Sequence, residues 1–256
     1  MCWSGEASAV LAAAGFCGSA YAAHKKESPL LWGPLLYFSL MELLQAYTYS
    51  VINQCSLPSN QVATLLGYLH ISFQPFFANA VSMYFINQNV RRKIQGWVYC
   101  VCFVSTIITL IQLYPFDWAG VCDPSRPLCG ERLCSVSGKW HIAWDIPTNG
   151  IGNSMTHWGV AFLKNGFLAY VVAVFFMPVI YGSWRFTLYH FLLGPMLAEM
   201  LTTNHNEKPA IWCLLSIGLL LLIIKTPFRQ LLFVKKWVLW PKSLLTQGEQ
   251  TVTVIL

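Results

Sequence analysis

Charged side chains are scarce in this sequence of 256 residues. They make up 10% of the chain, whereas an average soluble domain carries about 25%. With 56% hydrophobic residues, the chain could not cover a globular surface with polar groups. The composition therefore argues against a soluble enzyme, a disordered tail and a small disulfide scaffold, and it predicts a polytopic membrane protein.

Motifs of soluble enzymes are also missing. The sequence contains no GxSxG motif, no P-loop and no Rossmann glycine pattern. It has no HExxH or CxxC motif and no obvious internal repeat. Function must therefore be inferred from the placement of single residues.

Long apolar runs are what the sequence does have. A helix needs about 20 residues to cross the hydrocarbon core of a bilayer. Seven runs approach or meet that length: 5–23, 29–52, 61–86, 94–114, 152–181, 186–203 and 210–224. We therefore predict an all-α membrane protein, a seven-transmembrane helix bundle that forms one domain over residues 1–256. Its Cys-bearing outer lid loop is the polar segment 115–150, and the mixed basic and apolar segment 228–240 is an interfacial C-terminal helix.

Basic residues orient this bundle. With the N-terminus outside, the inner segments carry Lys25, Lys26, Arg91, Arg92, Lys93, Arg185, Lys225, Arg229, Lys235, Lys236 and Lys242. The outer segments then carry only Arg126, Arg132, Lys139, Lys164 and Lys208. Cytoplasmic loops hold the excess of Lys and Arg, so we expect the N-terminus outside. This bias explains the net charge of +6 without a nucleic-acid partner. The first run has no basic residue before it, which favours a retained span over a cleaved signal peptide.

Cysteines gather on the predicted outer face. The outer segments contain five of them: Cys2, Cys55, Cys122, Cys129 and Cys134. We expect two disulfides among these five and one free thiol, since an oxidising compartment favours such bonds. The predicted location is an integral, multi-pass membrane protein whose outer face meets an oxidising compartment.

Ionisable groups lie inside several runs, where they are costly and usually functional. At about 1.5 Å per residue, His70 lies roughly 13 Å, Glu42 roughly 16 Å and His190 roughly 20 Å below the outer face, and Glu199 only roughly 6 Å. Gln45 and Gln74 share helix faces with Glu42 and His70. A lock of interhelical hydrogen bonds is the structural alternative to a functional site.

Proline interrupts four of the runs, at Pro34, Pro75, Pro178 and Pro195. Kinks of this kind free backbone carbonyls and open space between helices.

The predicted lid has its own polar residues. If residues 139–147 are helical, His141 and Asp145 share one face at i,i+4, and His157 follows. A tryptophan-anchored interfacial loop with solvated histidines is the alternative interpretation.

These residues favour a membrane-embedded metalloenzyme, an oxidoreductase acting on a lipid-like or hydrophobic small molecule. Carboxylate and imidazole groups from facing helices suit iron, manganese or zinc. The candidate metal ligands are Glu42, His70, His190, Glu199 and His141, with His157 as another lid ligand and with Gln45 and Gln74 orienting them. Haem is a variant, held by His70 and His190. Membrane lipid is the expected partner.

Three other functions stay open. A proton- or ion-coupled transporter would use Glu42, His70 and Glu199 as a relay. A receptor-like seven-helix protein fits the number of runs, although a retinal site would need a buried lysine. A thiol-quinone oxidoreductase is disfavoured because CxxC is absent.

Three stretches carry a resemblance to a known family. The opening MCWS at 1–4, LMELLQ at 40–45 and YLHISFQPFFAN at 68–79 resemble a family of small polytopic membrane proteins of unknown function. The resemblance implies no activity, but it places Glu42, His70 and Gln74 inside the recognisable stretches. Beside it, a disulfide from Cys2 to Cys55 is the simplest pairing to expect.

Overall fold

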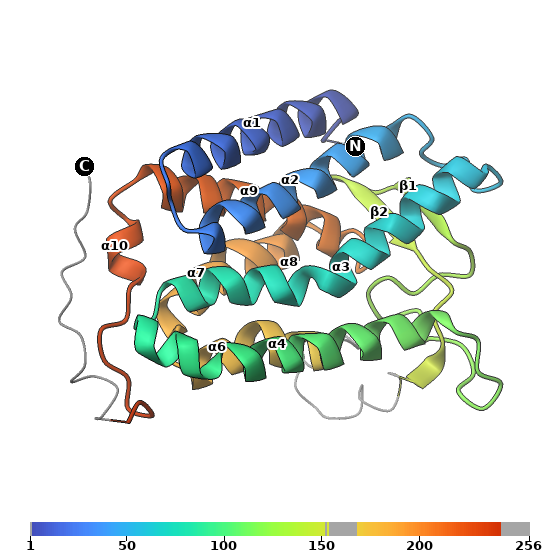
Figure 1. Ribbon diagram of the computed structural model, residues 1–256. Coiled ribbons are helices and arrows are strands. Elements are labelled where there is room, and N and C mark those ends of the chain that lie inside the picture. Colours follow the sequence, from blue (N-terminus) through green and yellow to red (C-terminus); the bar gives the residue numbers. More distant parts are fainter. Residues whose placement is uncertain (1, 152, 154–167, 242–256) are drawn as a thin grey trace.

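The computed structural model describes residues 2–151, 153 and 168–241, and its long helices lie side by side (Figure 1). α1, Gly5–His24, and α2, Pro29–Tyr49, form an antiparallel pair. The side chains of Ser4 and Ser28 accept hydrogen bonds from first-turn N–H groups, which starts each helix. The pair packs closely because a Cβ atom at Gly15 would overlap the Ser39 hydroxyl.

The next pair is α3, Pro58–Tyr84, and α4, Gln88–Leu110, which a short 3₁₀ turn, Ile111–Leu113, extends. Pro75 lies inside α3 and cannot donate a backbone hydrogen bond. Neighbouring side chains bind carbonyls near this break: the Thr106 hydroxyl of α4 donates to Ser72 O over 2.8 Å, and Asn79 Nδ2 donates to Pro75 O over 2.9 Å.

Two later helical segments contain π turns. The first runs through α5, Leu168–Val171, the π turn η3, Val172–Phe176, and α6, Met177–Ile180. The second runs through α7, Trp184–Phe191, the π turn η4, Leu192–Met196, and α8, Leu197–Leu201. Pro178 follows the first π turn and Pro195 lies in the second, because a missing N–H shifts the hydrogen-bond register.

The chain then forms α9, Lys208–Lys225, and α10, Arg229–Leu232. Of the predicted interfacial helix 228–240, only α10 is helical. After it, the indoles of Trp237 and Trp240 donate to the carbonyls of Ile180 and Tyr181, over 3.0 and 2.9 Å. These bonds hold the tail against the end of α6.

A small antiparallel sheet lies at the opposite end of the molecule from α10 (Figure 1). β1, Cys134–Ser137, pairs with β2, Ile142–Asp145, with Cys134 opposite Asp145 and Ser137 opposite Ile142. The predicted all-α class is therefore wrong, because part of the segment 115–150 forms strands. His141, directly before β2, and Asp145, at the end of β2, have different partners: Tyr49 contacts His141, and Asn206 contacts Asp145.

The predicted seven-transmembrane bundle is also wrong. Among the residues that the structure describes, one helix, Gln88–Leu113, is long and apolar enough to cross a bilayer. The helices Leu168–Ile180 and Lys208–Ile224 are apolar but shorter. Small residues in α1 and polar residues in α2 and α3 lower the mean hydropathy of these three predicted runs.

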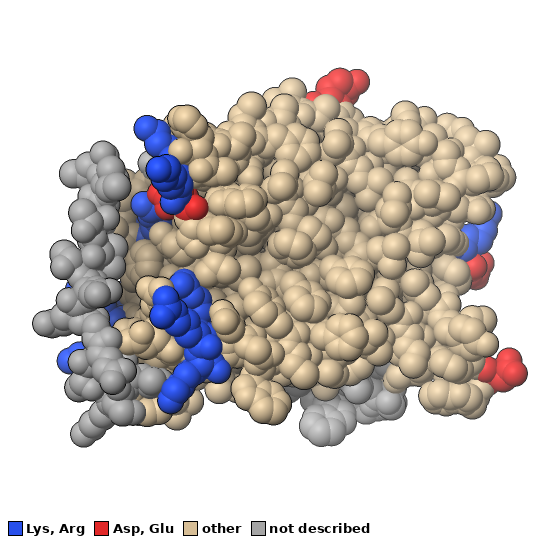
Figure 2. Space-filling model, in the orientation of Figure 1, with Lys and Arg blue, Asp and Glu red and all other residues tan. Residues whose placement is uncertain are grey.

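Many large apolar side chains lie on the surface nonetheless. On α4 they include Trp97, Phe103, Val104 and Ile107. Figure 2 shows basic side chains gathered at one end of the molecule, further charged side chains at the opposite end and an acidic group at the upper edge, and only uncharged side chains across the centre of this face. We call this middle zone the apolar band.

Candidate functional site

Glu42 and Gln45 lie on the buried face of α2, where they are 0% and 1% exposed. Their spacing of three residues places both side chains on the same side of the helix. Within the described residues, no oxygen or nitrogen of either side chain has a hydrogen-bond partner. The Ser8 hydroxyl of α1 faces Glu42 without completing a bond of normal geometry, and it accepts from Trp3 Nε1 over 2.8 Å.

His70 and Gln74 lie on α3, opposite α2. The His70 ring stacks on Tyr37 of α2 with ring centroids 3.8 Å apart, and the Tyr37 hydroxyl donates to the His70 carbonyl. His70 Nε2 and Gln74 Nε2 are buried and have no partner in the part of the chain that is described.

Tyr170 of α5 and Cys213 of α9 complete this region. Cys213 interacts electrostatically with Glu42, Tyr37 and Tyr170, so these four groups from three segments lie near one another. Met41 and Trp144 pack in the same apolar cluster as Tyr170 and Cys213. The buried polar core is defined here as the residues that have unpaired polar atoms in this region: Glu42, Gln45, His70, Gln74 and Tyr170.

The β1–β2 hairpin covers the outer end of this core. Trp144 of β2 packs on Gly67 of α3, where a Cβ atom would lie 3.4 Å from the indole ring. The carboxylate of Glu207 binds the hairpin by accepting hydrogen bonds from the backbone N–H groups of Trp140 and His141 and from the hydroxyl of Thr202. One buried carboxylate thus ties the hairpin to the start of α9.

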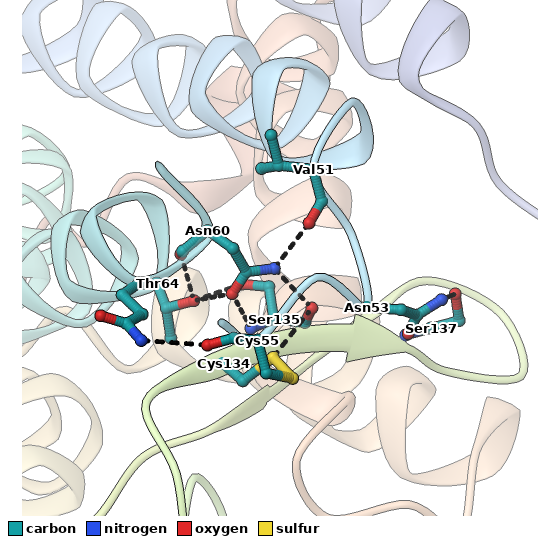
Figure 3. Close-up of a disulfide and its surroundings, with 9 residues drawn as sticks. Val51, Asn53, Cys55, Asn60, Thr64, Cys134, Ser135 and Ser137 are labelled. Carbon is teal, nitrogen blue, oxygen red and sulfur yellow. Dashed lines mark hydrogen bonds between the residues drawn. A yellow bond between two sulfur atoms is a disulfide. The ribbon is translucent and has the colours of Figure 1, made fainter. Parts of the chain in front are cut away.

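A disulfide and an asparagine hold the other side of the hairpin (Figure 3). Cys55 is bonded to Cys134 at the start of β1. Asn60 of α3 donates to Val51 O and Ser135 O over 2.8 and 3.0 Å, and it accepts from Ser135 N over 2.9 Å. The backbone of β1 is therefore hydrogen-bonded to a side chain of α3.

His141, in the β1–β2 hairpin, is buried and neutral. Its Nδ1 accepts from Ile142 N over 2.8 Å and lies 2.9 Å from the Tyr49 hydroxyl. Burial lowers the pKa of His141 to about 3. Glu207, which binds the backbone beside it, faces the N–H of His141 and not its ring.

The predicted metal site is wrong. No group of three or more His, Cys, Asp or Glu residues in the described chain could hold a metal ion. His190 Nε2 accepts from Trp212 Nε1 over 3.0 Å, and Glu199 forms an ion pair with Lys208 over 2.7 Å. His141 lies in the β1–β2 hairpin that covers the core. The metal, haem and oxidoreductase predictions fail with this ligand set. The depth of a residue along a helix, estimated from the sequence, did not determine the direction in which its side chain points. His157 lies outside the described residues.

Of the predicted cysteines, four form two disulfides, Cys55–Cys134 and Cys122–Cys129. The expectation of two disulfides is confirmed, and Cys2 is free and exposed. The expected bond from Cys2 to Cys55 is wrong. The disulfides indicate an oxidising, extracellular or secreted environment.

Sequence reasoning missed Glu207, Tyr37 and Asn79. Asn79 donates to Ala173 O in the π turn η3 over 2.9 Å and accepts from the Tyr181 hydroxyl over 2.9 Å, so it links α3 to the interrupted segment. Its position four residues after Pro75, from which an asparagine side chain can reach the carbonyl four residues earlier, was the signal available. Glu207 follows a polar turn, which gave no sign of its burial.

The fold and the core define a class: a mostly helical protein in which a disulfide-bonded hairpin covers buried, unpaired polar groups. A model described as a family of unknown function, DUF5765, matches residues 6–233, and the chain belongs to this family. No curated protein and no solved structure matches the chain. The resemblance to a family of unknown function is confirmed, whereas nothing in the match identifies it as a family of polytopic membrane proteins.

Proposed function

We propose that this protein is a proton- or ion-coupled transporter in which Glu42 binds and releases a proton. The observation that carries the proposal is the Glu42 carboxyl group, which is 0% exposed and meets no hydrogen-bond donor of normal geometry in the described chain. An ionised carboxylate left unpaired in a protein interior is so costly that the group takes up a proton instead. Release of that proton requires another state in which Glu42 meets water or a cation.

A structural lock would look different. If Glu42, His70 and Gln74 served only to join α2 to α3, their polar atoms would bond to one another. None of these bonds is present among the described residues. A buried polar group without a partner costs about 1–3 kcal/mol, and native proteins keep such groups where function needs them.

The π turns η3 and η4 favour movement in the segments around the core. Such turns are frequent at functional sites because they leave the regular hydrogen-bond ladder. Tyr170 lies two residues before η3, and His190 two residues before η4. The residues packed around the core are mainly apolar, which would suit a hydrophobic small molecule as the transported substrate.

Lipid is the proposed partner of the apolar band. Soluble monomers rarely expose contiguous apolar patches of more than a few hundred Å². The exposed apolar side chains continue along α4 as Trp97, Phe103, Val104 and Ile107 and reach Ile111 in the 3₁₀ turn that extends it. Acyl chains would cover this surface, and the basic end would meet anionic headgroups.

The test is proton flux in lipid vesicles that contain the full chain and a pH-sensitive dye. An imposed Na⁺ or K⁺ gradient should change the internal pH, and Glu42→Gln should reduce the rate at least tenfold. Glu199→Gln is the matched control, because its side chain is 59% exposed and ion-paired. Flux that is equal in wild type and Glu42→Gln would contradict the proposal. Infrared difference spectra should show a protonated carboxyl band that Glu42→Gln removes.

A further inference from the structure

An apolar groove runs along the surface between α1 and α9. It has a volume of about 730 Å³, within the usual range for small-molecule sites. The lining of the groove includes Ala14, Gly18, Tyr21, Gly218, Leu222 and Thr226. The groove lies outside the buried polar core and plays no part in the proposed proton binding.

The groove exists because two parallel helices meet through small residues. Gly15 lies against Ile217 and Gly18 against Leu221, so contacts advance in the same direction along both helices, and α1 and α9 are parallel. A Cβ atom at Gly218 would meet no atom within 4 Å, so the surface is hollow at this point. The eight residues from Ala14 to Tyr21 extend the groove by about 10 Å along α1.

One end of the groove meets positive charge. Lys25 Nζ lies 5.9 Å from the centroid of the Tyr21 ring, which lines the groove. Lys26 follows it and is exposed. Arg229 at the same end is already paired with Glu27 over 2.8 Å, which leaves the two lysines to attract an anion.

We propose that this groove binds an anionic lipid, with one acyl chain between α1 and α9 and the headgroup at Lys25 and Lys26. The inference rests on the lipid partner proposed above, but not on proton binding by Glu42. A second copy of the chain is a poorer occupant. In a symmetric dimer with parallel α1 helices, Lys25 and Lys26 of one copy would lie against Lys25 and Lys26 of the other, and like charges repel.

The test measures lipid bound to the purified, delipidated full chain by native mass spectrometry, with phosphatidylglycerol and phosphatidylcholine as probes. Gly218→Leu fills the groove and should weaken phosphatidylglycerol binding at least tenfold. Gly96→Leu is the control, because Gly96 of α4 is also exposed and also has no atom near its Cβ position. Both substitutions favour helix, so neither should impair folding.

A second pair of variants tests the headgroup. Lys25→Gln with Lys26→Gln should remove the preference for phosphatidylglycerol over phosphatidylcholine. Lys235→Gln with Lys236→Gln makes the same charge change outside the groove and should leave the preference intact. Equal binding by the two glycine variants would overturn the proposal, as would a dimer that Gly218→Leu converts to monomer. Glu42→Gln should bind lipid like the wild type, so a failure of proton flux and a failure of this site are separable.

Discussion

Glu207 illustrates how much of this fold depends on single buried residues. Its carboxylate accepts two backbone hydrogen bonds from the hairpin and one from Thr202, and the residue is fully buried. Hydrogen bonds to a charged group contribute about 1.5–3 kcal/mol each, and a lost partner leaves buried donors unpaired.

We expect Glu207→Gln to lower the free energy of unfolding by about 2–3 kcal/mol, because a neutral amide oxygen accepts the hydrogen bonds of Trp140 N and His141 N more weakly than the carboxylate oxygen does. Chemical unfolding followed by circular dichroism measures this change. Glu199→Gln, at an exposed site, should stay within about 0.5 kcal/mol of the wild type. Equal stability of the two variants would show that the negative charge of Glu207 does not strengthen the hairpin.

The buried His141 predicts a dependence of stability on pH. Its folded-state pKa of about 3 lies below the ordinary value of 6.5, so the unfolded chain binds more protons between these values. The stability from neutral His141 is therefore complete above about pH 6.5 and is lost as the pH falls towards about 3. Over that window we expect the unfolding free energy to change by up to about 1.4 kcal/mol per pH unit.

The measurement is the difference between wild type and His141→Gln in urea unfolding at pH 4, 5, 6 and 7. The difference isolates His141 from the other buried histidines, which both proteins share. A pH slope that is the same in both proteins would mean that His141 titrates normally in the folded state.

The burial of Glu42 and Gln45 could be predicted from the sequence, but the direction of the other candidate side chains could not. Glu42 and Gln45 were expected on one face of a helix, and both lie on the buried face of α2. His190 was expected at a similar depth, yet its ring turns to Trp212 of α9. Rotation about a helix axis depends on packing against neighbours, which depth along the chain does not encode.

At the scale of elements, local signals predicted helices better than strands. The expected run 29–52 begins where Ser28 and Pro29 begin α2, because capping and proline act within one turn. β1 has only four residues, and its partners Asn60 and Cys55 lie 75 and 79 residues away in the sequence. Contacts at that separation leave no periodic pattern in the strand itself.

The two disulfides should differ in how much they stabilise the fold. Cys55–Cys134 joins residues 79 apart and Cys122–Cys129 residues 7 apart. Loop-closure entropy grows with the length of the loop, which gives about 4.5 kcal/mol for the first and about 2.5 kcal/mol for the second. We therefore expect replacement of both Cys55 and Cys134 by Ala to destabilise the protein more than replacement of Cys122 and Cys129.

Thermal unfolding without reductant, as a change in Tm, compares the two double variants. Cys2→Ala is the control, since this thiol is free and exposed and its loss should leave Tm unchanged. A larger effect from the short loop would show that β1 is held mainly by Asn60 and Glu207.

At the scale of the whole molecule, the scarcity of charge was a reliable guide to surface character but not to the number of spans. Helices that pack around a polar core need small and polar residues on their inner faces, as α1 and α2 show with Gly15, Ser39 and Glu42. These residues lower the hydropathy of a helix while its outer face stays apolar. Length and mean hydropathy therefore select α4 among the described helices, whereas exposed apolar side chains occur on several.

The apolar band leads to a last prediction, which separates lipid from water as its surroundings. Phe103 on α4 is 56% exposed, and Val121, between α4 and the hairpin, is 83% exposed. In water, replacing either residue by lysine changes a solvated surface and costs less than about 0.5 kcal/mol. In hydrocarbon, a lysine costs about 2.5–3.5 kcal/mol at mid-depth. For protein in lipid bicelles, we therefore expect Phe103→Lys to lower the unfolding free energy by about 2–3 kcal/mol and Val121→Lys to leave it almost unchanged. Trp97, which is 77% exposed, supplies a second readout, because acyl chains that carry bromine should quench its fluorescence. Small and equal effects of the two lysines, together with unquenched Trp97, would place the band in water and remove lipid as its partner.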